Sequence, residues 1–121
     1  MARVTFEIPA RDRERARRFY ESVFQWQATD LPDVSFTLLS APADSSSDPE
    51  EVEIIGGLAV QTPLVKAPVP IITVDSIETA CRAVVQAGGG RITDRQRVGE
   101  YGYSTYVEDS EGNVLCLWEN P

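Results

Sequence analysis

The sequence has no histidine among its 121 residues. Imidazole is the side chain that most often accepts a proton near neutral pH, and it is a common nitrogen ligand for zinc. Its absence excludes Ser-His-Asp and Cys-His catalysis and any histidine-based zinc site. Cysteine is scarce as well: Cys81 and Cys116 are the only two, too few for a disulfide framework. We therefore expect both thiols to be reduced and packed in a core.

Basic residues are few and unevenly placed. Lys and Arg number 11 against 19 Asp and Glu, a net charge of −8, and residues 27–60 hold acidic residues but no basic one. Phosphate backbones and anionic lipids repel such a chain, so we expect neither nucleic acid nor a membrane as partner. The sequence also lacks a signal-peptide pattern and any apolar run approaching about 18 residues. We expect a cytoplasmic protein.

The chain is long enough for one domain, and its hydrophobic pattern repeats once. Each half predicts a strand, a capped helix and three further strands. In the first half Asp12 is the expected helix N-cap, and in the second half the N-cap is Asp75 or Ser76. The strand-like runs cover 4–8, 26–29, 35–40 and 53–60, and then 71–74, 91–98, 104–108 and 114–119.

Both predicted helices carry an apolar stripe with the same spacing, 61 residues apart. The stripes are Ala16, Phe19, Tyr20, Val23 and Phe24, and then Ile77, Ala80, Cys81, Val84 and Val85. The polar tract 44–51 predicts a hairpin tip, and three glycines at 88–90 predict the end of the second helix.

The order βαβββ, connector, βαβββ predicts a single domain over 1–121. Its first module covers about 1–61, its connector about 62–68 and its second module about 69–121. Because neither half can bury its apolar helix stripe alone, we expect two four-stranded sheets to pair around a shared concave space. Such a space is a natural small-molecule site.

Several motifs, in order along nearly the whole chain, resemble the glyoxalase/bleomycin resistance/dioxygenase group, the vicinal oxygen chelate superfamily. They are Phe6-Glu7-Ile8-Pro9, Arg15-Ala16-x-x-Phe19-Tyr20-x-x-Val23-Phe24-x-Trp26, Gly56-Gly57-Leu58, Val74-Asp75-Ser76-Ile77, Ala87-Gly88-Gly89 and Asp109-x-x-Gly112-Asn113-x-x-x-Leu117-Trp118-Glu119. The resemblance implies an α+β fold in which two βαβββ modules form a cupped mixed sheet. It also implies a homodimer, with modules paired within or between chains.

The resemblance further implies a divalent metal in the cleft, held by His, Gln or Glu on the first and last strand of each module. Carried over to this chain, those positions fall at Thr5, near Val69, at Cys116 and within the stretch 56–58. None supplies one of these ligands, so we expect no transition metal and no other cofactor. An oxygen-only magnesium or manganese site built from Glu7 and its neighbours stays open.

Strand alternation predicts which side chains line the concave space. We expect Thr5 and Glu7 to share that face of the first strand, with Val4, Phe6 and Ile8 beneath the helix. Cys116 and Trp118 should share a face of the last strand, and Glu119 should point away from it. The candidate ligand-binding residues are Thr5, Glu7, Trp26, Phe36, Tyr103, Tyr106, Cys116 and Trp118, with Tyr101 as a further lining residue.

An aromatic pocket with one carboxylate suits a flat or cationic small molecule. The leading interpretation is therefore a metal-free small-molecule binding protein. A second interpretation is a lyase or isomerase that uses Glu7 as a general base, with or without a weakly held divalent metal. A third is a non-catalytic dimeric interaction subunit.

Overall fold

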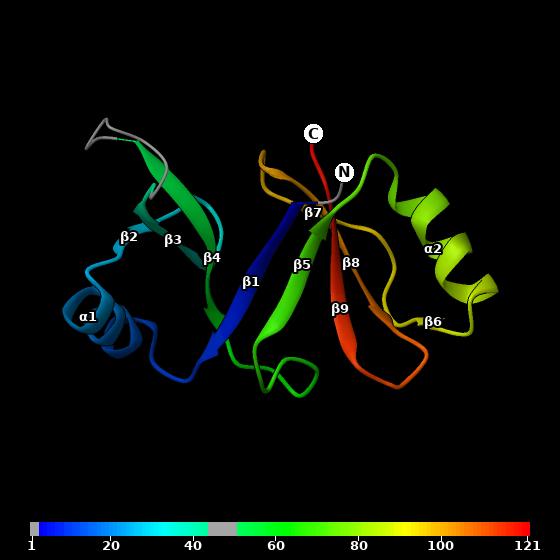
Figure 1. The fold of residues 1–121 in the computed structure, drawn as a ribbon, viewed down its shortest axis with the longest axis horizontal. Helices are drawn as coiled ribbons and strands as arrows, with labels where there is room; N and C mark the ends of the chain where they lie inside the picture. The colour runs from blue at the N-terminus through cyan, green and yellow to red at the C-terminus, as the bar shows by residue number, and fades with distance from the viewer. Residues whose placement is uncertain (1–2, 44–50) are drawn as a thin grey trace. The chain divides into compact units, whose positions relative to one another are not determined.

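The structure is a computed structural model, and it describes residues 3–43 and 51–121. The chain divides into two compact units (Figure 1). The N-terminal unit is Phe6–Pro68, and the C-terminal unit is Met1–Thr5 together with Val69–Pro121. None of the helices in the described ranges is long and apolar enough to cross a membrane.

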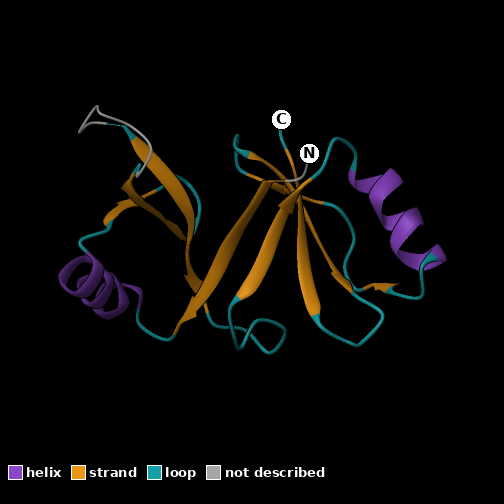
Figure 2. Ribbon diagram, in the orientation of Figure 1, coloured by secondary structure: helices purple, strands orange, loops and turns teal. Residues whose placement is uncertain are grey.

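The N-terminal unit contains a four-stranded mixed sheet and one helix (Figure 2). The strand order is β2-β3-β4-β1; β1 is parallel to β4, and the other neighbours are antiparallel. Its elements are β1 (Arg3–Ala10), which belongs to this unit from Phe6 onward, α1 (Arg13–Phe24), β2 (Gln27–Asp30), β3 (Phe36–Pro42) and β4 (Val52–Val60).

The C-terminal unit repeats this plan. Its strand order is β5-β9-β8-β6, with β5 parallel to β9 and β7 also paired with β8. Its elements are β5 (Val69–Thr73), α2 (Ile77–Gln86), β6 (Gly90–Arg91), β7 (Gln96–Val98), β8 (Gly102–Glu108) and β9 (Val114–Glu119). The predicted α+β class with two βαβββ modules is confirmed.

The predicted single strand over 91–98 is wrong in its extent, because β6 and β7 are separate short strands. Between them, the amides of Ile92 and Thr93 both donate to the carbonyl oxygen of Tyr106, at 2.9 and 3.2 Å. Two residues therefore oppose one residue of β8, which is the geometry of a bulge and interrupts regular pairing. The hairpin tip predicted for 44–51 lies, apart from Glu51, outside the described residues.

The predicted helix ends are confirmed. Asp12 is the N-cap of α1 and accepts a hydrogen bond from the amide of Arg15 at 3.0 Å. Of the two alternatives for α2, Ser76 is the N-cap. Gly88 follows the C-cap of α2 with a φ of 99°, a left-handed conformation that glycine adopts without strain.

Each unit has its own core between its helix and one face of its sheet. We call this the helix face, and the other the helix-free face. In the N-terminal unit the buried core residues are Ala28, Leu39 and Leu58. In the C-terminal unit they are Ile77, Cys81, Val107 and Leu117.

The two apolar stripes are buried to different degrees. In α2, Ile77 and Cys81 are buried as predicted. In α1 no residue is fully buried, and Phe19, Val23 and Phe24 are each more than half exposed. The prediction that this whole stripe faces the core is wrong.

The prediction that Val4, Phe6 and Ile8 all pack beneath the helix is correct only for Ile8. Ile8 packs on the core, but Val4 and Phe6 are about half exposed. The reason is that α1 lies mainly against β4 and β2, so it does not cover the first half of β1.

A buried hydroxyl ties α1 to its sheet. Thr37 on β3 is only 1% exposed, and its Oγ1 donates to Asp30 Oδ1 at 2.6 Å and accepts from the Arg13 guanidinium at 3.0 Å. The equivalent residue of the other unit is Thr105 on β8, which is also 1% exposed. Its Oγ1 has no hydrogen-bond partner among the described residues.

Candidate functional site

Glu7 lies on the helix-free face of the N-terminal unit. It alternates along β1 with Ile8, which packs on the core beneath α1. Glu7 is 8% exposed, so the fold removes a carboxylate from most of its water. Thr5 lies two residues earlier on the same side of the strand and is half-buried. Both residues have the orientation that strand alternation predicts.

An aromatic ring lies beside Glu7 because the neighbouring strand has a glycine there. Gly57 on β4 pairs in register with Glu7. A Cβ atom placed on Gly57 would lie 2.3 Å from the Phe36 ring of β3 and 2.6 Å from the Thr37 carbonyl oxygen. The ring of Phe36 therefore occupies the space that a side chain at Gly57 would need. The structure brings together the carboxylate and one predicted aromatic residue.

The helix-free face of the C-terminal unit has a second aromatic group. Cys116 and Trp118 alternate along β9 with Leu117, which belongs to the core beneath α2. Tyr106 of β8 pairs in register with Cys116 and lies on the same face. These three predicted residues are brought together, and Cys116 is buried.

A glycine again makes room for the ring. A Cβ on Gly102 of β8 would lie 2.5 Å from the indole of Trp118. The indole N–H donates to Asn120 Oδ1 at 3.1 Å, which fixes the orientation of the ring. Gly57 and Gly102, which make room for these two rings, are not among the ligand-binding residues predicted from the sequence. A glycine inside a predicted strand is the sequence feature that could have identified them, because it often marks a place where another group packs closely against the backbone.

Two of the predicted site residues lie elsewhere. Trp26 packs on the helix side of the N-terminal unit, where its ring stacks on Tyr20 at a centroid distance of 5.4 Å. Tyr103 lies on the helix face of the C-terminal unit, beneath the guanidinium of Arg95 at 3.6 Å from the ring centroid. Tyr101 is half-buried in the turn after β7, with its amide donating to Val98.

Glu119 points to the helix face, as its position next to Trp118 predicts. Its carboxylate accepts from the Ile77 amide at the start of α2 and from Arg95, both at 2.8 Å. The hydrogen bond from the Ile77 amide, followed by that from Arg95, lowers the pKa of Glu119. Cys81 is buried in the core of the C-terminal unit, and this burial raises the pKa of its thiol.

The four positions that match the family's metal ligands do not fit a divalent ion. Thr5 offers a hydroxyl group, Val69 an aliphatic side chain and Gly57 none, with the Phe36 ring filling its space. The Cys116 thiol is buried against a backbone carbonyl oxygen at 3.8 Å. Residues 3–43 and 51–121 contain no group of three or more His, Cys, Asp or Glu placed to hold a metal ion.

The fold is thus an α+β chain of two βαβββ units, each with a helix on one face of its sheet and aromatic side chains on the other. The chain matches the model of the Glyoxalase/Bleomycin resistance protein/Dioxygenase superfamily over residues 3–117, and it belongs to that superfamily. No curated protein sequence matches the chain significantly.

Solved structures agree with this fold. The chain is similar to a glyoxalase/bleomycin resistance protein/dioxygenase superfamily member from Vibrio splendidus, with 15% identity, 100% of both chains covered and a TM-score of 0.64. It is also similar to a structure described as an NAD-dependent benzaldehyde dehydrogenase from Legionella pneumophila, with 13% identity, coverage of 98% and 100%, and a TM-score of 0.69. Methylmalonyl-CoA epimerase from Mycobacterium tuberculosis has 12% identity, coverage of 98% and 85%, and a TM-score of 0.57. At these identities the likeness concerns the fold alone.

Proposed function

We propose that this protein binds a flat aromatic or cationic small molecule on its helix-free faces without a transition metal. The observation that carries the proposal is the repeated use of glycine to lay an aromatic ring on the sheet. Gly57 admits the ring of Phe36, and Gly102 admits the indole of Trp118. A ring packed against a strand glycine has already lost much of its rotamer freedom, so a ligand that stacks on it does not bear that entropy cost.

The chemistry of the two faces sets the ligand class. Stacking on a fixed ring contributes about 0.5–1.5 kcal/mol beyond the apolar area that it buries. A cation gains about 0.5–2 kcal/mol over an aromatic face, most when water is excluded. Glu7 adds a carboxylate that is only 8% exposed. Its attraction for a cation is therefore weakly screened.

A thermal-shift screen of aromatic ammonium compounds against their neutral isosteres tests the proposal. We expect the cations to raise the melting temperature more than the isosteres. Glu7→Gln keeps the side-chain shape and should remove this preference, whereas Phe36→Ala, in the same unit, should weaken both series. Glu53→Gln, on the exposed part of β4, is the matched control for the lost charge. A Glu7→Gln variant that binds every hit as well as the wild type would contradict the proposed site.

One observation favours a second candidate function, a lyase or isomerase. Glu7 is a buried carboxyl group on the helix-free face, and a carboxylate within hydrogen-bond reach of a substrate proton serves as a general base. Exchange of a substrate C–H hydrogen with deuterated water, abolished in Glu7→Gln, would favour this enzyme over a binding protein. Binding without exchange would favour the first function.

The predicted homodimer is also a proposal. It is supported by the apolar side chains of Phe19, Val23 and Phe24 on α1, each more than half exposed. Light scattering after size exclusion should give twice the chain mass of 13.3 kDa. A monomer at micromolar concentration would contradict it, and a dimer that binds no small molecule would favour the interaction subunit.

A further inference from the structure

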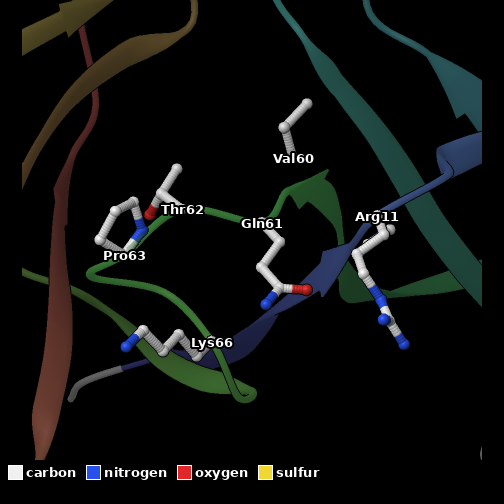
Figure 3. Close-up of a pocket in the computed structure, with 7 residues that line it drawn as sticks. Arg11, Val60, Gln61, Thr62, Pro63 and Lys66 are labelled. Atoms are coloured by element: carbon white, nitrogen blue, oxygen red, sulfur yellow. The ribbon is translucent and has the colours of Figure 1, made fainter.

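A second candidate site lies within the N-terminal unit, where β1 and β4 end side by side. The two strands are parallel, and Ala10 and Val60 form their last registered pair. The residues that follow line an open depression of about 480 Å³ (Figure 3). We call it the basic depression; its lining residues are Ala10, Arg11, Val60, Gln61, Thr62, Pro63 and Lys66.

The basic depression concentrates positive charge in an acidic protein. Arg11 and Lys66 both line it, and no acidic residue does. Neither cation forms an ion pair or a hydrogen bond with any residue in the described ranges. The nearest acidic neighbour in sequence, Asp12, uses its carboxylate to cap α1. Two uncompensated cations on a chain of net charge −8 indicate a site for an anion.

The backbone around the depression is fixed by hydrogen bonds. The amide of Gln61 donates to the carbonyl oxygen of Ala10 at 3.0 Å, and that of Thr62 donates to the carbonyl oxygen of Val65 at 3.2 Å. In return the amide of Val65 donates to Thr62 Oγ1 at 3.0 Å, and Val65 itself is buried. The hydroxyl of Thr62 is thus held by its acceptor side, and its hydrogen can donate to a ligand.

The lining also has a fixed apolar part. Ala10, Val60 and Pro63 contribute only carbon side chains, and Figure 3 shows the Gln61 amide between Arg11 and Lys66. Cations and an amide donor suit an oxyanion, and the apolar part suits a short alkyl group attached to it.

We propose that the basic depression binds a small organic carboxylate. Arg11 and Lys66 lie on either side of the Gln61 amide and attract the carboxylate, the Gln61 amide donates to it, and the alkyl body lies against the apolar part of the lining. None of these residues belongs to the helix-free faces of the proposed function. The site is therefore a second one, and its test is independent of the first.

Sodium butyrate, titrated into ¹⁵N-labelled protein at constant ionic strength, tests this proposal. We expect saturable shifts of the Gln61 and Thr62 amide resonances, with a dissociation constant on the order of millimolar because both cations are exposed. The double variant Arg11→Gln/Lys66→Gln should weaken binding at least about tenfold, and Lys66→Gln alone about threefold. Arg18→Gln, an exposed cation of α1 outside the depression, should change it by less than about twofold.

Three results would overturn the proposal. The first is shifts that sodium chloride reproduces at the same ionic strength. The second is unchanged butyrate affinity in Lys66→Gln and in the double variant, with circular dichroism showing that both are folded. The third is saturable binding of inorganic phosphate without binding of butyrate, which would assign the depression to phosphate rather than to an organic carboxylate.

Discussion

Thr37 and Thr105 occupy equivalent positions in the two units, and replacing each by valine should change stability in opposite directions. Both are 1% exposed, and they pair in register with Leu58 and Leu117 respectively. The hydroxyl of Thr105 has no partner among the described residues, whereas that of Thr37 bonds to two charged groups. Replacing threonine by valine therefore removes a buried, unpaired hydroxyl group at Thr105, whereas at Thr37 it removes two hydrogen bonds.

The magnitudes follow from the hydrogen bonds. A buried unsatisfied polar group costs about 1–3 kcal/mol, so Thr105→Val should raise the free energy of unfolding by about 1 kcal/mol or more. Hydrogen bonds to charged groups contribute about 1.5–3 kcal/mol. Since the side chain of Asp30 is 64% exposed and can turn to water, Thr37→Val should lower stability by only about 1–2 kcal/mol.

Urea unfolding monitored by far-UV circular dichroism measures both effects. Equal slopes against denaturant would show that the two variants and the wild type expose the same surface. The midpoint for Thr105→Val should lie above that of the wild type and the midpoint for Thr37→Val below it. Two changes of the same sign, or a destabilised Thr105→Val, would refute the assignment of the two hydroxyl groups.

Two further predictions concern the glycine that makes room for the Phe36 ring and the stability of the protein at acidic pH. Gly57→Ala should destabilise the protein by about 1–3 kcal/mol, because the new Cβ would meet the Phe36 ring at 2.3 Å. Gly90→Ala is the control, because nothing lies within 4 Å of its new Cβ, and its free energy of unfolding in urea should stay within about 0.5 kcal/mol of the wild type. Equal effects of the two substitutions would contradict the close packing of Phe36 on Gly57. The pKa of Glu119 is lowered below 4.5 in the fold, so its stabilisation is present above that pH and is lost as pH falls through the folded pKa. Glu119→Gln should therefore flatten the decline of melting temperature below about pH 4.5, and an unchanged acid limb would rule out this role.

The repeating pattern made the fold predictable from sequence. Asp12 and Ser76 cap the helices because a short acceptor side chain precedes each apolar stripe. Strand extent was less predictable. The bulge at Ile92 and Thr93 depends on the shared Tyr106 carbonyl oxygen, which no local pattern of residues indicates.

The candidate site was predictable where it depends on strand alternation and not where it depends on tertiary packing. Alternation alone oriented Glu7, Cys116 and Trp118. Trp26 and Tyr103 were assigned to the site only because they are aromatic, and in the structure both lie on the helix side of their sheets. Trp26 stacks on Tyr20, and the guanidinium of Arg95 covers the ring of Tyr103. The face to which a strand residue points follows from its position along the strand, whereas the side chains that pack against it depend on the tertiary fold.

Calorimetric titration of an aromatic ammonium ligand, with and without excess chelator, tests whether this protein binds such a ligand without a metal. We expect the same dissociation constant in both solutions for the wild type, and an affinity about tenfold lower for Glu7→Gln. Binding that disappears with chelator and returns with added nickel, zinc or iron would contradict this expectation.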